Sequence, residues 1–395
     1  MWYSIIHFIG LLFALISLPG TLELSLLTLA AIFSGQSFKK SDAKSNLEQS
    51  ALKIAVVMPA HNEAAGITQC IASVQRSAEF VDHCDIIVIA DNCTDDTAEK
   101  ARQAGARVLV RNNPDQRGKG FALDYAFQTL WPENHQGFLV LDADSRVDVN
   151  LLMAFKEKLA EGWDAVQCRY RIANPEATTR TQLQYLAGLA FNELRLLGRE
   201  TLGVSVGILG NGFMLSRATL EKVPYQATSI TEDLEYHLRL VQAGFRVHFL
   251  PTTLVYADAP CQDTNAQTQR SRWEGGRLRM IIEHSPGLIR ALVGGQWRML
   301  EPLAELWLLP LGFHVILLFL ALLAGDVSVC YYAIGAFTML GIHVLAAIFM
   351  NGGGWREIKV LFMVPAYVLW KLRLLPSLWR SASNSTAWQR TGREK

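Results

Sequence analysis

The chain has 395 residues, and its 37 Lys and Arg side chains are nearly balanced by 36 Asp and Glu side chains. A formal net charge of +1 gives no global attraction to polyanions, so no nucleic acid is expected as a partner and local motifs have to identify the ligands. Half of the residues are hydrophobic, and the excess lies at the two ends of the chain, which predicts an integral membrane protein with one aqueous domain. The six cysteines show no metal-ligand or disulfide spacing, which fits a reducing cytosolic setting.

The N-terminal segment is apolar over residues 2–33, longer than the roughly 20 residues that span a bilayer. No basic segment precedes it, so we expect a transmembrane helix in a first domain, 1–35, and not a cleaved signal peptide. Three lysines follow in a polar linker, 36–52. The positive-inside rule therefore places the next domain in the cytoplasm.

The middle of the chain alternates between β-branched apolar runs and amphipathic segments. Alternation at this spacing predicts a parallel, doubly wound α/β sheet whose strand ends face one cleft. The expected strands are 53–58, 85–90, 107–110 and 138–141. Three helices are expected: 65–77, a second helix that Thr94 or Asp95 caps and that ends at residue 104, and 121–130.

Two carboxylates, Asp142 and Asp144, follow the fourth expected strand. Open α/β sheets bind ligands at the carboxyl ends of their strands. Hard divalent cations such as Mg²⁺ or Mn²⁺ take oxygen ligands and are commonly held by one or two carboxylates plus substrate phosphates. The pair therefore predicts a metal site.

The other strand ends deliver further polar side chains to the same edge. Glu63 and Asp91 are acceptors for a base and a ribose, and Lys119 is a cation for a phosphate. Each has an ordinary alternative when taken singly: a helix cap, a turn or a surface lysine. Together they indicate a nucleotide-diphosphate site, without the Walker loop of a kinase or the glycine fingerprint of a dinucleotide dehydrogenase.

The combination of motifs resembles the membrane-bound family 2 glycosyltransferases, which include the cellulose, chitin and hyaluronan synthases and bacterial exopolysaccharide enzymes. The resemblance covers about 53–279 and the flanking membrane helices. The motifs that carry it, in order, are Pro59-Ala60-His61-Asn62-Glu63, Asp91-Asn92-Cys93-Thr94-Asp95, Lys119-Gly120, Asp142-Ala143-Asp144, Thr231-Glu232-Asp233 and Gln269-Arg270-Ser271-Arg272-Trp273.

The resemblance implies a Rossmann-like GT-A domain with a parallel-rich sheet over 53–276, flanked by transmembrane and interfacial helices. It implies a UDP-sugar donor and Mg²⁺ or Mn²⁺ on the diphosphate. The implied catalytic residues are Asp233, as general base, and Glu232; the implied donor-binding residues are Pro59, His61, Glu63, Asp91, Lys119, Asp142, Gln269, Arg272 and Trp273; the implied metal ligands are Asp144 and Asp142; and the implied acceptor-binding residues are Gly210, Asn211 and Trp273.

Two motifs in the second half of the domain bear on the acceptor and the base. Residues 208–215 form a glycine-broken apolar run that suits close approach of an acceptor to the backbone, although it matches the synthases only loosely. Thr231 opens an expected helix through residue 242, which puts Glu232 and Asp233 in its first turn. A plain helix start, where the macrodipole favours carboxylates, is the alternative.

The C-terminal part reads as membrane-associated. We expect an amphipathic interfacial segment over 277–300, a transmembrane hairpin over 301–350, and an interfacial helix with a cytoplasmic tail over 351–395. Three or four spans result.

The predicted function is inverting, metal-dependent transfer of a sugar from a nucleotide-sugar to a growing polysaccharide at the cytoplasmic face of a bacterial inner membrane. Transfer of a single sugar to a glycolipid or polyprenol-linked acceptor is the alternative, and a non-catalytic subunit of a polysaccharide assembly is a further one. Membrane lipids are expected partners, with oligomerisation or an export partner as two ways to complete a polymer channel. The sequence selects neither the sugar nor the linkage.

Overall fold

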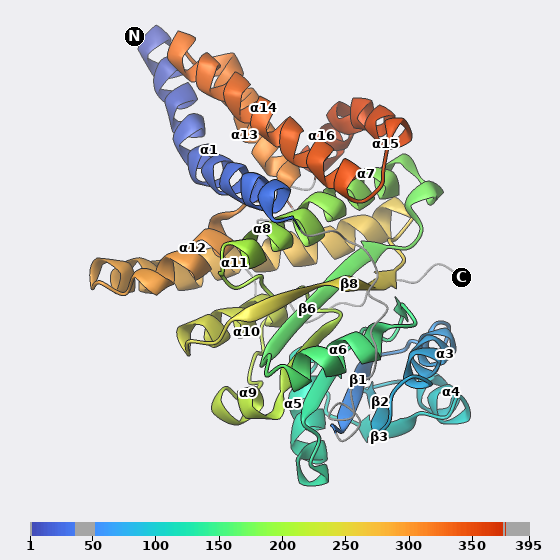
Figure 1. The fold of residues 1–395 in the computed structure, drawn as a ribbon. Coiled ribbons are helices and arrows are strands. Elements are labelled where there is room, and N and C mark those ends of the chain that lie inside the picture. The colour runs from blue at the N-terminus through green and yellow to red at the C-terminus, as the bar shows by residue number, and fades with distance from the viewer. Residues whose placement is uncertain (1, 36–51, 374–375, 377–395) are drawn as a thin grey trace. The chain divides into compact units, whose positions relative to one another are not determined.

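The structure is a computed structural model that describes residues 2–35, 52–373 and 376 (Figure 1). The predicted linker, apart from residue 52, and most of the predicted cytoplasmic tail lie outside the described residues. The described residues form two compact units. One, the sheet unit, comprises residues 52–174 and 205–266, and the other, the helical unit, comprises 2–35, 175–204 and the residues from 267 onward. Residues 175–204, which the sequence analysis placed in the aqueous domain, thus cluster with the apolar helices.

The sheet unit contains one eight-stranded sheet with helices on both faces. Its strands follow the order β3-β2-β1-β4-β7-β6-β8-β5. The strands are β1 (Ile54–Ala60), β2 (Cys84–Asp91), β3 (Arg107–Arg111), β4 (Gly137–Val140), β5 (Arg146–Val147), β6 (Ala165–Ile172), β7 (Phe213–Ser216) and β8 (Val247–Ala257). The helices are α3 (Ile67–Ala78), α4 (Thr97–Gln103), α5 (Lys119–Leu130), α6 (Leu151–Ala160), α9 (Arg217–Lys222) and α10 (Glu232–Gln242).

The four predicted strands are all present, and β1, β2, β3 and β4 pair in parallel. The sheet as a whole is mixed, because β7 runs antiparallel to both β4 and β6, and β5 runs antiparallel to β8. Four of the seven strand pairings are parallel, so the parallel-rich sheet that the resemblance implied is confirmed, and the antiparallel pairings are what the sequence did not indicate. Local periodicity marks a strand but carries no information on the direction in which a distant strand joins it.

The core explains why these segments form strands between helices. Alternate residues of β1 point to opposite faces, and Val56 and Met58 pack with α3, α4 and α6 in one fully buried cluster. On the opposite face, Phe127 of α5 meets Phe138 of β4 edge to face, with ring centroids 5.3 Å apart. Each such buried side chain stabilises the fold by about 1.5–3 kcal/mol. The carboxyl ends of β1 to β4 are thereby held at one edge.

The helical unit is built around α1 (Trp2–Phe33), which contacts α8, α13 and α14 (Figure 1). Its other members are α7 (Thr179–Gly188), the π-helix η3 (Leu189–Leu194), α8 (Arg195–Thr201), α11 (Asp263–Val293), α12 (Leu300–Trp307), α13 (Leu311–Ala324), α14 (Val327–Met350), α15 (Trp355–Val360) and α16 (Val364–Leu372). Four short 3₁₀ helices, η1 (Trp131–Glu133), η2 (Pro175–Ala177), η4 (Trp297–Met299) and η5 (Leu361–Met363), connect the elements of both units.

Polar side chains join the apolar helices of this unit. Thr28 of α1 lies 2.8 Å from Nδ1 of His343 on α14. Arg199 of α8 forms an ion pair with Glu23 of α1 at 2.8 Å. A buried polar group in an apolar bundle needs such a partner, because an unpaired one is costly.

Two described helices, Ile5–Phe33 and Val327–Met350, are long and apolar enough to cross a membrane. The predicted first arm of the hairpin is broken, because Trp297–Trp307 and Leu311–Ala324 meet at 84°. Pro310 explains the break, since proline lacks an N–H and forces the preceding residue out of the helical region. The described residues therefore supply two candidate spans, or three if the bent pair counts as one, where the sequence predicted three or four. Within the predicted C-terminal segment, 351–395, the structure has the helices α15, η5 and α16, and their place at a membrane surface stays a prediction.

Candidate active site

The loops after β1, β2 and β3 interlock through two asparagines in the left-handed region. Asn62 follows β1 with φ 55° and Asn92 follows β2 with φ 50°, a conformation that asparagine tolerates better than most residues. The Asn62 Oδ1 accepts a hydrogen bond from the Thr94 amide at 2.7 Å, and the Asn92 Oδ1 accepts one from the Asn113 amide at 2.9 Å. Each strand end is thus fixed to the next.

Most of the predicted donor residues of the first three strands lie in these loops. Pro59 is in β1, and the His61 ring Nδ1 lies 2.8 Å from the Asp91 carbonyl oxygen at the end of β2. The Glu63 amide donates to the Thr97 hydroxyl at 2.8 Å. The Asp95 side chain accepts from the Thr97 amide at 3.0 Å, but the N-cap position of α4 is Asp96, one residue after the two predicted capping residues.

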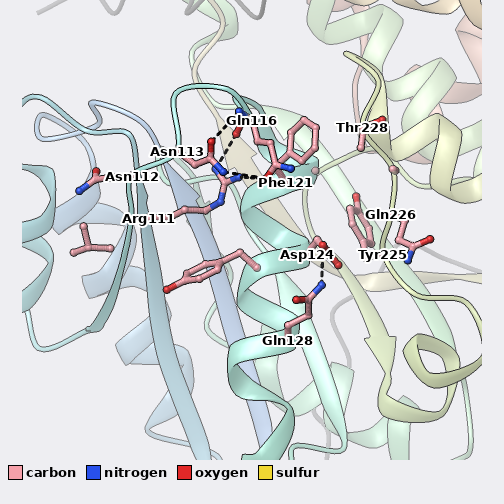
Figure 2. A pocket seen from close by; sticks show the side chains of 14 residues that line it. Arg111, Asn112, Asn113, Gln116, Phe121, Asp124, Gln128, Tyr225, Gln226 and Thr228 are labelled. Atoms are coloured by element: carbon pink, nitrogen blue, oxygen red, sulfur yellow. Dashed lines mark hydrogen bonds between the residues drawn. The ribbon is translucent and has the colours of Figure 1, made fainter.

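Asp91 is buried and forms an ion pair with Arg111 of β3, with Oδ1 and Nη1 2.7 Å apart. Arg111 also donates to the Gln116 carbonyl oxygen at 2.8 Å. Arg111 and Gln116 line a pocket of about 510 Å³ that extends along the outer side of α5, with Asp124 and Tyr225 also in its wall (Figure 2). The sequence analysis missed Arg111, although a cation directly after an apolar strand was the available signal.

Lys119, at the start of α5, connects the strand ends to the second half of the unit. Its Nζ lies 2.5 Å from the Asp142 Oδ1 and also donates to the Gly210 carbonyl oxygen. Burial by itself lowers the pKa of Lys119, but the charges of Asp142 and Glu232 outweigh it, and the net pKa is raised. Lys119 is therefore a firmly charged ammonium in the centre of the site.

The turn before β7 is held by buried amides. Gln167 of β6 donates to the carbonyl oxygens of Asn211 and Gly212 at 2.8 and 3.1 Å, and its Oε1 accepts from the Leu209 amide at 2.9 Å. The Asn211 side chain accepts from the Asp142 amide at 3.1 Å. Asn211, predicted as an acceptor contact, is thus occupied in joining this turn to the Asp142 loop, and Gln167 is a positioning residue that sequence reasoning missed.

Glu232 and Asp233 lie in the first turn of α10, beside Lys119. A β-carbon built on Gly210 would lie 2.9 Å from the Asp233 Oδ2, so Gly210 leaves the space that this carboxylate occupies. Burial raises the pKa of Glu232 to about 8, with the charge of Asp233 adding to the shift. Burial also raises the pKa of Asp233, against the hydrogen bond from the Leu234 amide. The two neighbouring carboxyls therefore favour sharing one proton between them.

The residues present fit a divalent cation. Asp142, Glu232 and Asp233 all raise the pKa of the single ammonium of Lys119, so negative charge exceeds positive charge here. Asp144 follows β4 two residues after Asp142, half-buried beside the start of α3. Carboxylate oxygens at a strand end, with an uncompensated negative charge, are the donor set that Mg²⁺ or Mn²⁺ prefers.

A second acidic cluster lies at the opposite ends of the same parallel strands. Asp85, Glu133 and His135 bring three ligand atoms within 4.8 Å of one another. Lys53 pairs with Asp85 at 2.8 Å and Arg107 pairs with Glu133 at 2.7 Å. Because each carboxylate already has a cation, we interpret this cluster as a structural charge network and not as a metal site.

The remaining predicted residues, Gln269, Arg272 and Trp273, lie on α11 in the helical unit. The Trp273 side chain is 39% exposed, and the Arg270 guanidinium lies over its ring at 5.6 Å from the centroid. The indole therefore has one cation beside it and part of its surface exposed, and its predicted role on a sugar stays a prediction.

Comparison with known proteins finds relatives that cover the sheet unit. Residues 51–276, more than half of the chain, match the family model described as "Glycosyltransferase like family 2". The chain is 25% identical over 242 residues to "Probable glycosyltransferase YdaM" of Bacillus subtilis, and the match covers 58% of this chain and 56% of that relative. It is 43% identical over 77 residues to "Low-salt glycan biosynthesis hexosyltransferase Agl6" of Haloferax volcanii, covering 20% of this chain and 18% of that protein. The chain thus spans little more than half the length of the first of these relatives.

The fold also has a counterpart among solved structures. The "Mannosyltransferase PcManGT from Pyrobaculum calidifontis in complex with GDP-Man and Mn2+" superposes with a TM-score of 0.52 and covers 94% of this chain and 97% of its own, at 15% sequence identity. An identity this low establishes the fold alone. The sheet unit therefore has the predicted GT-A fold, with a mixed sheet.

Proposed function

The chain belongs to glycosyltransferase family 2, and on that premise we propose that it transfers a hexose from a UDP-sugar, with inversion, to a saccharide acceptor at a membrane. The observation that supports this best is the convergence on Lys119 of the Asp142 carboxylate and the Gly210 carbonyl group, with Glu232 and Asp233 close by. One ammonium among three carboxylates suits a diphosphate leaving group together with a base for the acceptor.

In this proposal the donor nucleotide lies along the ends of β1 to β4. Asp91, held by Arg111, and Glu63 would accept hydrogen bonds from the base and ribose, with Pro59 and His61 shaping the loop. Lys119 would exchange its contact with Asp142 for the diphosphate oxygens. Its raised pKa keeps it charged for that role.

Asp142 and Asp144 would hold Mg²⁺ or Mn²⁺. When bound, such an ion supplies Lewis-acid stabilisation of the negative charge on the diphosphate. The solved mannosyltransferase with the similar fold is in complex with GDP-Man and Mn²⁺, which is consistent with this choice of metal.

Asp233 would remove the proton from the acceptor hydroxyl while the hydroxyl oxygen forms its bond to the anomeric carbon. The bond between the anomeric carbon and the diphosphate would break on the opposite face of that carbon. A general base works best when its pKa is near the operating pH, and burial raises the pKa of Asp233 in that direction. Glu232 would keep the shared proton, which would leave Asp233 as the ionised partner. Gln269, Arg272 and Trp273 would close over the donor, with the indole on the acceptor sugar.

For the acceptor, a growing polysaccharide is favoured by analogy, because the Gln-x-x-Arg-Trp segment is followed by membrane helices as in the synthases it resembles. A lipid-linked acceptor is the second candidate. It is favoured by the small number of described spans, two or three, which are few for enclosing a polymer in one chain. In both cases we place the sheet unit at the cytoplasmic face of a bacterial inner membrane, from the lysines that follow the first span.

The test is turnover by the purified full chain in detergent with Mn²⁺, using a panel of UDP- and GDP-sugars and measuring nucleotide release. GDP-mannose belongs in the panel because the structural relative binds it. Release of UDP from one donor, dependent on a membrane extract as the acceptor source, is the expected result. Radiolabelled donor followed by solvent extraction and sizing then separates polymer from one-sugar lipid. Donor binding without release from any donor would support a non-catalytic subunit.

A further inference from the structure

Glu235, in the first turn of α10, holds the loop that precedes this helix. Its Oε2 accepts hydrogen bonds from the amides of Thr228 and Ser229 at 3.1 and 2.9 Å. Its Oε1 lies 2.6 Å from the Arg239 Nη2, one turn later in α10. The Glu235 residue is only 9% exposed, so both carboxylate oxygens make these contacts largely away from solvent. We call residues 223–231, which join α9 to α10, the α9–α10 loop.

The two amide contacts fix the second half of this loop. Thr228 and Ser229 lie outside helices and strands, so their amides belong to no backbone ladder. A buried amide without an acceptor costs free energy, and a hydrogen bond to a charged acceptor is among the stronger ones. One carboxylate that reaches back seven and six residues therefore holds two consecutive residues of the loop.

The first half of the loop is fixed by other contacts. The Tyr236 hydroxyl donates to the Val223 carbonyl oxygen at 2.7 Å. The Tyr225 ring packs against the rings of Tyr236 and Phe127, with centroids 4.3 and 5.5 Å away. These contacts anchor the loop to α10 and to α5 at its beginning. The part that depends on Glu235 is therefore the part that leads directly into the first turn of α10.

This second half of the loop meets the candidate active site at Gly120, the second residue of α5. A β-carbon built on Gly120 would clash with the Ala227 carbonyl oxygen and would lie 3.4 Å from the Glu232 Cβ. The loop, the start of α5 with Lys119 and the start of α10 with its two carboxyls thus pack together at one point. The position of the loop therefore determines how the first turn of α10 faces Lys119.

We propose that Glu235 is a positioning residue for the transfer reaction. By holding Thr228 and Ser229, Glu235 keeps the first turn of α10 in place, and with it Asp233, the proposed base. The consequence for catalysis rests on the proposed function, whereas the contact of Glu235 with the loop does not.

Hydrogen–deuterium exchange of the purified full chain in detergent measures the contact with the loop without any turnover. Glu235→Ala removes both acceptor oxygens. Amides in a peptide that spans 223–231 should then exchange about tenfold faster, because a hydrogen bond to a charged group contributes on that scale. Glu235→Gln keeps one acceptor oxygen without the charge and should give an intermediate rate. Amides of β1 should exchange as in the wild type, which shows that the sheet unit is folded.

Nucleotide release by the folded fraction then measures the consequence for catalysis. Glu235→Ala should lower kcat by about tenfold, because a displacement of about 1 Å in a catalytic group costs on the order of a hundredfold and a smaller shift is expected here. The donor KM should change by less than about threefold, since the proposed donor contacts at the ends of β1 to β4 lie outside the loop. Glu235→Gln should recover most of kcat.

Glu283→Ala is the matched control. Glu283 is also a helical glutamate paired with an arginine four residues away, Arg279, at 2.7 Å, but it lies exposed on α11. This variant should leave the exchange of the loop and the turnover unchanged.

Three results would count against the proposal. Wild-type exchange of the loop in Glu235→Ala would show that the carboxylate does not hold it. Faster exchange of the loop together with wild-type kcat would overturn the positioning role. A wild type that releases no nucleotide from any donor would overturn the proposed function and the catalytic consequence with it, while the exchange rates would still decide whether Glu235 holds the loop.

Discussion

Gly210→Ala tests whether the turn before β7 sets the position of the proposed base. Gly210 has φ +78°, and an added β-carbon would lie 2.9 Å from the Asp233 Oδ2. A carbon and an oxygen do not approach this closely without a shift, so either the turn or the carboxylate has to move. Movement of the turn would also displace the Gly210 carbonyl group that accepts from Lys119.

The chain offers a matched control in Gly162, which has φ +83° and would meet nothing within 4 Å if it gained a β-carbon. An alanine in the left-handed region costs about 1–2 kcal/mol at either position. For a domain of this size, each kcal/mol lowers the melting temperature by about 2–4 °C. Both variants should therefore lose a similar amount of thermal stability.

Turnover should separate the two variants. A displacement of about 1 Å in a catalytic group costs on the order of a hundredfold in rate, and the few tenths of an ångström needed here should cost about tenfold or more in kcat. Nucleotide release by Gly162→Ala should match the wild type at a temperature well below melting. If Gly210→Ala turned over as fast as Gly162→Ala, the turn would not determine the geometry of Asp233 and this reasoning would be refuted.

Three further substitutions follow from the site. Asp144→Asn should abolish turnover and weaken UDP binding in Mn²⁺, because an amide is a poorer ligand for a hard cation; activity that survives chelation would contradict the metal assignment. Asp233→Asn should eliminate transfer while UDP-sugar binding stays nearly intact, so wild-type turnover in this variant would place the base elsewhere. Trp273→Ala should reduce turnover severely whereas Trp297→Ala, at a position 76% exposed, should not; equal losses would indicate general destabilisation.

The parallel half of the sheet and its polar ends were predictable because both depend on local signals. An apolar run followed directly by carboxylates, as at Asp142, specifies a buried strand and an exposed end within seven residues. The mixed half was not predictable in this way. The hydrogen bonds of Gln167 to the turn at Asn211 join positions 44 residues apart, and nothing near Gln167 in the sequence indicates which distant carbonyl group it meets.

In the helical unit, the sequence could have indicated one break in a helix, but it could not have indicated a contact between residues that lie far apart in the chain. The broken span at Pro310 was readable, since a proline inside an expected helix favours a break at the residue before it. The contact of Arg180 on α7 with Trp370 on α16 was not, because the two lie 190 positions apart and interact through a cation–π contact. Motif spacing thus located the proposed donor residues, while the residues that support them depend on tertiary contacts.

The raised pKa of Glu232 predicts how the metal-free protein responds to pH. The pKa of Glu232 rises from 4.5 to about 8 on folding. Between these two pH values the folded state keeps a proton on Glu232 that the unfolded state has released. The free energy of unfolding should therefore be highest near the lower end and fall as pH rises towards about 8, by an amount on the order of a few kcal/mol.

Glu232→Gln removes this titration, so the melting temperature of the variant in EDTA should depend less on pH than that of the wild type. The two melting temperatures should differ most at the alkaline end, because there the wild type carries the buried charge. Added Mn²⁺ should stabilise the wild type more at high pH than at low pH, because a cation compensates the charge that burial opposes. Parallel pH profiles for the wild type and Glu232→Gln in EDTA would mean that Glu232 is ionised throughout, and that the shared proton lies on Asp233 instead.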